Sequence, residues 1–281
     1  HGDPPEVATR VRRTKRRVAE TVLETVDTRG VIPPVVMVPP LIVYWFITSF
    51  CPNECEHCVA AEIRDRSDEV GRDDLFRLAD RLIEAGIPWI ALTGGEPLAR
   101  PELPELVAHL RDADVACFLT TSGAGLSRKS LSALREAGLA RILVSLDGPP
   151  KVQDGFRGPG SHETSMKALE ILRGGGVPYG ISTTVHAGNV DALEYVRNMA
   201  RDSGSSQLFV NEYVPQCAED HGAMRALDAP QRDQLYRDLH RLRTEDSFSP
   251  WAGQYKFQIV SPLATAWVSE EEARLRGRPP R

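Results

Sequence analysis

Residues 88–112 read "PWIALTGGEPLARPELPELVAHLRD" and contain both halves of the unit from which this fold is built. The apolar run at 88–93 has the length and composition of a buried strand, and 102–112 repeats its apolar residues at helical spacing. The same succession occurs six times from residue 41 onward. The predicted strands are 41–48, 88–93, 115–121, 140–146, 178–185 and 207–213, and the predicted helices are 71–86, 102–112, 127–137, 161–173, 189–202 and 230–243.

Such alternation is typical of parallel strands joined by helical crossovers. We therefore predict an α/β fold, a partial (β/α)6 TIM-like barrel with an N-terminal helix at 5–28 and a short C-terminal extension. The predicted divisions are 1–40 for the helix and an extended segment after it, 41–245 for the barrel and 246–281 for the extension. Within the extension, "KFQIV" at 256–260 is a candidate for one further strand.

The composition limits the class of protein. The chain has 281 residues, a formal net charge of −5 and five cysteines. Mild acidity argues against a general nucleic-acid binder, and a few clustered cysteines are unlike the disulfide framework of a secreted protein. The longest apolar stretch, 31–47, contains Pro33, Pro34, Pro39 and Pro40, so it cannot form a regular membrane-spanning helix. We expect a cytoplasmic protein with no membrane or nucleic-acid partner.

Polar residues follow each predicted strand. In parallel α/β folds the C-terminal ends of the strands meet at one rim, and that rim carries the chemistry. We therefore predict a single site at the mouth of the barrel. The polar strand ends are 51–58, 93–97, 120–123, 145–148, 183–186 and 211–213, and the generic lining candidates are Asn211, Glu212, Tyr213 and Arg157.

The first strand end, "FCPNECEHC" at 50–58, places Cys51, Cys55 and Cys58 on one short loop. A disulfide needs two cysteines, and a closed structural zinc site needs four ligands. Three thiolates can hold a metal centre and leave one coordination position open, because an iron–sulfur cube with three protein ligands has one free iron. A zinc site that takes its fourth ligand from elsewhere is the alternative, although no second C-x2-C pair follows.

The C-x3-C-x2-C loop, the later "GGEP" at 94–97 and "SLDG" at 145–148 together resemble the radical S-adenosylmethionine (radical SAM) enzymes over about residues 41–215. The resemblance implies that Cys51, Cys55 and Cys58 bind three irons of a [4Fe–4S] cluster and that SAM chelates the fourth iron. It further implies reductive cleavage of SAM to a 5′-deoxyadenosyl radical, which abstracts a hydrogen atom from the substrate.

The resemblance also assigns cofactor-binding candidates. His57 would cover the cluster and the adenine, Gly94, Gly95 and Glu96 would contact the methionyl amino group, and Ser122 would lie near the ribose or sulfonium. A carboxylate suits an ammonium, and glycines allow close backbone approach. Further candidates for ribose or substrate contact are Ser145, Asp147, Thr184 and, more weakly, His186. For Ser122 and Asp147 the alternative is a cap on a helix or turn.

The remaining two cysteines differ in their surroundings. Cys117 lies in the apolar strand "VACFL" and is expected in the core. Cys217, in "VPQCAED" after the sixth strand, is a candidate hydrogen-atom donor, as in radical SAM epimerases, and the alternative is a bystander on a loop. Arg157 resembles an Arg-Gly pair of relatives with a second cysteine-rich domain, but no cysteine follows Cys217, so we expect no auxiliary cluster.

Three functions follow. The first is a radical SAM enzyme acting on a small natural-product or carbohydrate-like substrate, by epimerisation, dehydration, deamination, decarboxylation or oxidation. The second is a peptide-modifying radical SAM enzyme without its auxiliary region. The third is a zinc-stabilised binding module. Either enzyme would take electrons from a donor such as flavodoxin or ferredoxin.

Overall fold

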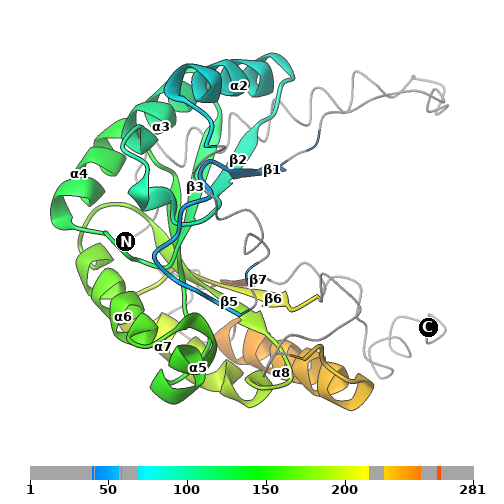
Figure 1. The fold of residues 1–281 in the computed structure, drawn as a ribbon. Helices are drawn as coiled ribbons and strands as arrows, with labels where there is room; N and C mark the ends of the chain where they lie inside the picture. The colour runs from blue at the N-terminus through cyan, green and yellow to red at the C-terminus, as the bar shows by residue number, and fades with distance from the viewer. Residues whose placement is uncertain are drawn as a thin grey trace, which may run out of the picture.

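The computed structural model describes residues 40, 42–56, 58, 69–214, 225–247 and 258–260. Within these residues, seven strands form one parallel sheet whose spatial order is the order of the chain. Figure 1 shows the sheet curled, with the helices along its outer side. The strands are β1 (Ile42–Phe46), β2 (Trp89–Thr93), β3 (Ala116–Thr121), β4 (Arg141–Ser145), β5 (Tyr179–Val185), β6 (Gln207–Glu212) and β7 (Gln258–Val260).

The helices follow the strands in the predicted rhythm. Their bounds are α2 (Arg72–Glu84), α3 (Leu103–Asp112), α4 (Arg128–Ala137), α5 (Pro150–Arg157), α6 (Ser161–Leu172), α7 (Leu193–Ser203) and α8 (Ala229–Ser247), with 3-10 turns η3 (Pro97–Ala99) and η4 (Val190–Ala192). Helices α2, α4 and α6 end shortly before Gly86, Gly138 and Gly174, which all take positive φ angles. A partial barrel of parallel βα units is therefore the fold.

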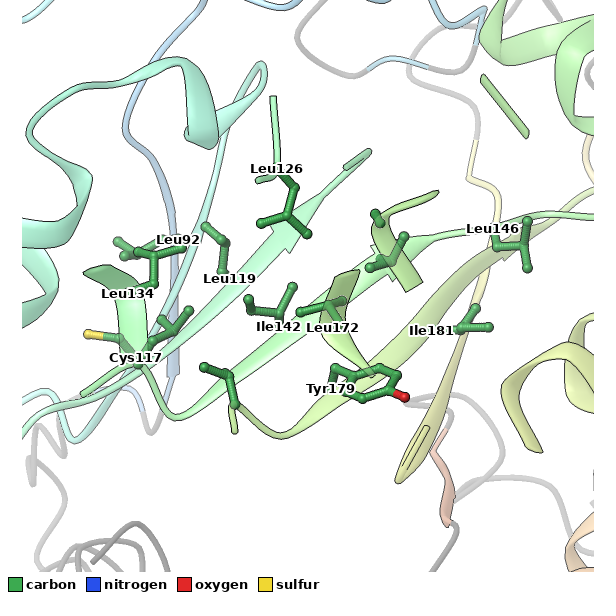
Figure 2. Packing of buried hydrophobic residues seen from close by; sticks show 14 of the residues in the cluster. Leu92, Cys117, Leu119, Leu126, Leu134, Ile142, Leu146, Leu172, Tyr179 and Ile181 are labelled. Atoms are coloured by element: carbon green, nitrogen blue, oxygen red, sulfur yellow. The ribbon is translucent and has the colours of Figure 1, made fainter. Parts of the chain in front are cut away.

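The core lies between the sheet and the outer helices. Alternate residues of the central strands face outward and are buried, among them Leu119 of β3 and Ile142 of β4, both fully. Figure 2 shows these side chains meeting Leu134 of α4 and Leu172 of α6. Cys117 belongs to the same cluster, as predicted. Each buried leucine or isoleucine contributes about 1.5–3 kcal/mol relative to an exposed one, so this layer supports the rim above it.

The structure differs from the prediction in two places. Helix α5 was not predicted, because it is short and is flanked and interrupted by Pro149, Gly155 and Gly158. Pro150 at the first helical position is the sequence signal that could have indicated this helix. Helix α8 continues to Ser247, past the predicted end at 243. The candidate strand in 256–260 is confirmed as β7, whereas the predicted helix at 5–28 lies outside the described residues.

The end of β2 is joined to the segment that leads into the cysteine loop. The backbone N–H of Gly95 donates to the Thr48 carbonyl, and that of Glu96 donates to the Phe50 carbonyl, both at 2.7 Å. A Cβ on Gly95 would lie 2.0 Å from the Phe50 oxygen, and one on Gly94 would lie 2.4 Å from the Thr48 oxygen. The two glycines are therefore required because they pack against the backbone of Thr48–Phe50, the segment immediately before Cys51.

We predict that Gly95→Ala destabilises the protein by about 1–3 kcal/mol, because the added methyl group must displace the Phe50 backbone. Chemical denaturation measures the change. Gly155→Ala is the matched control. A Cβ at position 155 would meet nothing within 4 Å, and alanine has a higher helix propensity than the glycine it replaces in α5. Equal stabilities of the two variants would contradict this account of the glycine pair.

Candidate functional site

The cysteine loop lies directly after β1, at the rim where the strands end. Cys51, Cys55 and Cys58 are each partly exposed, and all three are free of disulfide bonds in the described structure. The backbone N–H of Cys58 donates to the Cys55 carbonyl at 3.2 Å, so the loop turns between these two residues. Partly exposed thiols on one turn are suited to binding a metal cluster.

Helix α5 also holds this loop. The backbone N–H of Glu56 donates to the Phe156 carbonyl at 2.8 Å. The Cys55 thiol lies 3.9 Å from the carbonyl oxygen of Arg157, to which it donates. The last two residues of α5 thus carry two backbone acceptors for consecutive residues of the loop, although they are about one hundred positions away in sequence.

A buried ion pair fixes the end of α5 to the sheet. The Arg157 Nε donates to Asp147 Oδ2, and the Asp147 side chain has no exposed surface. The same carboxylate accepts the backbone N–H of Thr184 at 2.7 Å and the Thr183 hydroxyl at 3.3 Å. Asp147 therefore joins the ends of β4 and β5 to the helix that holds the cysteine loop.

Burial and charge act in opposite directions at this junction. Burial raises the pKa of the Cys55 thiol above its ordinary value, and Arg157 opposes the rise while Cys51 and Cys58 add to it. For Arg157, burial would lower the pKa, but Asp147 and, to a smaller extent, Cys55 together outweigh burial, so the pKa lies above the ordinary value. Arg157 is thus a permanent cation beside the middle cysteine.

Glu96 occupies a second polar centre, between the ends of β2 and β3. Its Oε1 accepts the Thr121 hydroxyl at 2.6 Å and the Leu98 N–H at 3.1 Å, and its Oε2 accepts the Ser122 hydroxyl at 2.6 Å and N–H at 2.9 Å. The residue is 1% exposed. Burial raises the pKa of Glu96, while these hydrogen bonds lower it to a smaller extent. The prediction thus placed Glu96 and Ser122 near one cofactor, and the structure places them in direct contact.

The predicted candidates on β4 and β5 lie close to α5. Ser145 is buried opposite Ser182 in the strand register, and Thr184 binds Asp147 through its backbone. His186 is 2% exposed and meets Phe156 edge to face, with ring centroids 4.8 Å apart. Its Nδ1 accepts the Gly188 N–H at 3.1 Å, and its Nε2 has no partner among the described residues. Burial lowers the pKa of His186, so the neutral ring presents its proton at Nε2.

The candidates at the end of β6 have separate surroundings. Asn211 donates to the Ser182 hydroxyl at 3.4 Å and is in register with Thr184 near the end of β5. Glu212 accepts from Arg232 of α8 at 2.7 Å, and Tyr213 is buried with Phe156. His57 and Cys217 lie outside the described residues.

Two buried amides were missed by the sequence analysis. The Gln153 side chain accepts the Asp147 N–H and donates to Ser165, each at 3.0 Å. The Asn189 side chain donates to the carbonyls of Asp147 and Thr184 at 3.0 and 2.9 Å. Because Gln153 belongs to the unpredicted helix α5 and Asn189 to a turn, only the tertiary fold brings them to Asp147.

The donor set suits a cluster better than a single ion. Among the described residues, no three Cys, His, Asp or Glu side chains converge closely enough to hold one metal ion. In an iron–sulfur cube each thiolate binds a different iron, so the three sulfurs do not have to converge on one point. Three cysteines on one loop therefore fit a [4Fe–4S] cluster that keeps one iron open for a small ligand. None of the described helices has the length and apolar character needed to cross a membrane.

Known proteins similar to this chain agree with that fit. The family model described as "Radical SAM superfamily" matches residues 45–202. An AdoMet-dependent heme synthase of Methanosarcina barkeri is 32% identical over 63% of this chain and 51% of its own length. A PqqA peptide cyclase of Bradyrhizobium diazoefficiens is 33% identical over 61% of this chain and 46% of its own length. The chain thus spans about half the length of the curated relatives it matches.

Solved structures share the fold at low identity. SuiB of Streptococcus suis, bound to S-adenosylmethionine, superposes with a TM-score of 0.66 at 13% identity over 88% of this chain and 54% of its own. The protein anSMEcpe, with bound AdoMet, gives 0.63 at 19% identity over 78% of this chain and 63% of its own.

The three-cysteine loop, the glycine turn packed behind it and a family match over more than half of the sequence lead to one assignment. An enzyme family takes the place of the zinc-stabilised binding module. The chain belongs to the radical SAM superfamily, whose members use a [4Fe–4S] cluster and S-adenosylmethionine.

Proposed function

We propose that this protein cleaves SAM reductively and uses the resulting radical to abstract hydrogen from an organic substrate at the mouth of the barrel. The observation that carries the proposal is the position of Cys51, Cys55 and Cys58 on one loop, which is held by the turn after β2 and by α5. When bound, the cluster and SAM supply electron transfer and a 5′-deoxyadenosyl radical. The chain supplies position, charge and shielding from water.

Glu96 and the glycine turn would bind the methionyl part of SAM. The Glu96 carboxylate already accepts four hydrogen bonds, two at each oxygen, so its acceptor capacity is filled. To accept from an ammonium group it must release one of these donors. The Ser122 hydroxyl can rotate away while its backbone N–H stays in place. Ser122 thus acts as a stand-in donor that leaves when SAM binds.

The inner face of the sheet supports an organic substrate with an apolar body. Phe118 of β3, Leu143 of β4 and Phe209 of β6 alternate with the outward core residues and remain partly exposed. Polar groups lie next to them on β5 and β6, where Ser182 is in register with Phe209 and Asn211 donates to the Ser182 hydroxyl. We propose a small molecule of the tetrapyrrole class as the first candidate, since heme synthase and Fe-coproporphyrin III synthase are names of relatives.

A peptide is the second candidate. Its support is the similarity to PqqA peptide cyclases, which reaches 33% identity. A porphyrin with carboxylate side chains and a PqqA-type peptide can be compared in one assay. The compound that is a substrate should raise 5′-deoxyadenosine formation above the rate without substrate. Mass spectrometry of the substrate then reports which one has lost hydrogen, and no response to either would set both candidates aside.

We predict that anaerobic reconstitution with iron and sulfide gives a brown protein that releases 5′-deoxyadenosine from SAM in the presence of dithionite. Cys55→Ala should reduce that release to background, because a cube with two protein ligands is poorly held. Cys117→Ala is the matched control: this thiol is buried in the core and should be dispensable for cleavage. Full cleavage by Cys55→Ala, or colourless wild-type protein, would refute the assignment of the loop.

Cys217 stays a prediction as hydrogen-atom donor. Cys217→Ala should still cleave SAM and fail to release product, because the substrate radical would lack its hydrogen source. If Cys217→Ala forms product at the wild-type rate, the thiol is not the hydrogen-atom donor. We further propose a cytoplasmic setting, with flavodoxin or ferredoxin as electron donor.

The raised pKa of Glu96 predicts a pH effect on the cluster-free protein. Above its ordinary value of 4.5, the folded protein retains a proton at Glu96 that the unfolded chain releases, so rising pH costs folding free energy at this site. This loss of folding free energy is absent below pH 4.5 and complete above the raised pKa of Glu96. The free energy of unfolding of the wild type should therefore fall relative to Glu96→Gln as pH rises. Parallel curves for the two proteins, from denaturant titrations at several pH values, would show that burial does not perturb this carboxylate.

A further inference from the structure

A buried arginine after β2 contacts both ends of residues 47–70, which carry the three cysteines and which we call the cysteine segment. Arg100 directly follows η3, and its side chain is 5% exposed. Its Nη1 donates to the Ile47 carbonyl at 3.0 Å, where the chain leaves β1. At the other end of the segment, Nη2 donates to the Val70 carbonyl at 2.6 Å and Nη1 donates to Glu69 Oε1 at 3.0 Å. One side chain therefore joins the two ends of the cysteine segment.

Arginine is the residue type that suits these contacts. Its guanidinium carries several N–H groups in one rigid plane, so it can donate to acceptors on different parts of the chain at once. A buried guanidinium also needs those acceptors, because an unpaired charge away from water is costly. A second carboxylate, Glu102 Oε2, lies 3.3 Å from Nε without the alignment of a hydrogen bond. Glu102 immediately precedes α3 and lies outside the cysteine segment, so this ion pair does not restrain that segment.

Glu69 adds a second link between the two ends. Its Oε1 accepts from Arg100, and its Oε2 accepts from the Ser49 hydroxyl at 3.4 Å. Ser49 lies two positions before Cys51, so a carboxylate from the far end of the segment binds beside the first cysteine. The Glu69 side chain is 24% exposed, and its pair with buried Arg100 is therefore screened less by water than a pair on the surface.

Joining the two ends of a segment has a consequence for binding by the residues between them. It lowers the number of conformations that those residues can take. A cluster that binds three cysteines must order them, and binding is tighter when part of that ordering is already present. The contacts of Arg100 supply such ordering before the cluster binds. Because coupling between two equilibria is reciprocal, a bound cluster should in turn stabilise these contacts.

We propose that Arg100 is a positioning residue for the cluster: by binding Ile47, Glu69 and Val70 it fixes both ends of the cysteine segment and slows the loss of iron. Arg100 acts through the chain and not by contact with iron or SAM. This inference rests on the proposed function, because it requires that the three cysteines bind the [4Fe–4S] cluster.

The test uses the full chain, with and without reconstitution, and compares the two carboxylates that pair with Arg100. Glu69→Gln weakens the link to the cysteine segment and keeps the shape of the side chain. Glu102→Gln is the matched control, because its side chain is 23% exposed and faces the same guanidinium but lies outside the segment. Arg100→Lys keeps the charge and loses the planar fork that reaches both carbonyls.

Two quantities are measured: the rate of iron loss to a chelator, and the rise in thermal midpoint when cluster-free protein is reconstituted. For Glu69→Gln we expect iron loss about 5-fold faster than in the wild type, or more, as is usual for two coupled sites. The rise in midpoint should be smaller than in the wild type, because a more weakly bound group stabilises the fold less. Glu102→Gln should match the wild type in both quantities, even where its cluster-free midpoint is lower. Arg100→Lys should lose iron faster than Glu69→Gln.

The outcomes separate this inference from the proposed function. A wild type that binds no cluster overturns both. A wild type with a cluster, together with equal iron loss from Glu69→Gln and Glu102→Gln, overturns only the role of Arg100. A wild type that holds its cluster but does not cleave SAM overturns the proposed function, and the rates of iron loss still decide the role of Arg100. If Arg100→Lys does not fold, the two glutamate variants decide alone.

Discussion

Parallel pairing of neighbouring strands is the constraint on which the rest of the molecule depends. Each strand from β1 to β7 pairs with the next in sequence, so all C-terminal strand ends lie on one rim. The loops that follow the strands meet there, although they come from segments far apart in the chain. The apolar layer beneath, between the sheet and the outer helices, keeps that rim rigid.

The rim contains two polar centres with different chemistry. Glu96 forms an acidic centre whose side-chain hydrogen bonds come from Thr121 and Ser122 at the end of β3 and from Leu98 of η3. Asp147 and Arg157 form an ion pair between the ends of β4 and β5 and helix α5. The cysteine loop lies between them, tied to the first centre through Phe50 and to the second through Cys55. This arrangement fixes the loop from both sides.

The regular part of the fold could be predicted because it depends on local patterns. The strands β2 and β3 begin within one residue of their predicted positions, since short apolar runs alternate with helical ones. Helix α5 could not be predicted in that way: its eight residues include Gly155, and its stability comes from buried Gln153 and Phe156. For the glycine pair the structure adds a packing requirement, because both glycines approach the Thr48–Phe50 backbone closely, and their contact with the methionyl amino group stays a prediction.

The sequence by itself determined the three-cysteine spacing, the GGEP motif and the order of the βα units, because each is written in neighbouring residues. Those features were enough for the fold class and for the candidate iron ligands Cys51, Cys55 and Cys58. Only the tertiary structure decided which side chains surround the cysteines. Arg157 reaches Cys55 from 102 positions away, and Asp147 holds it there, because pairing distant charges requires the buried junction that folding creates.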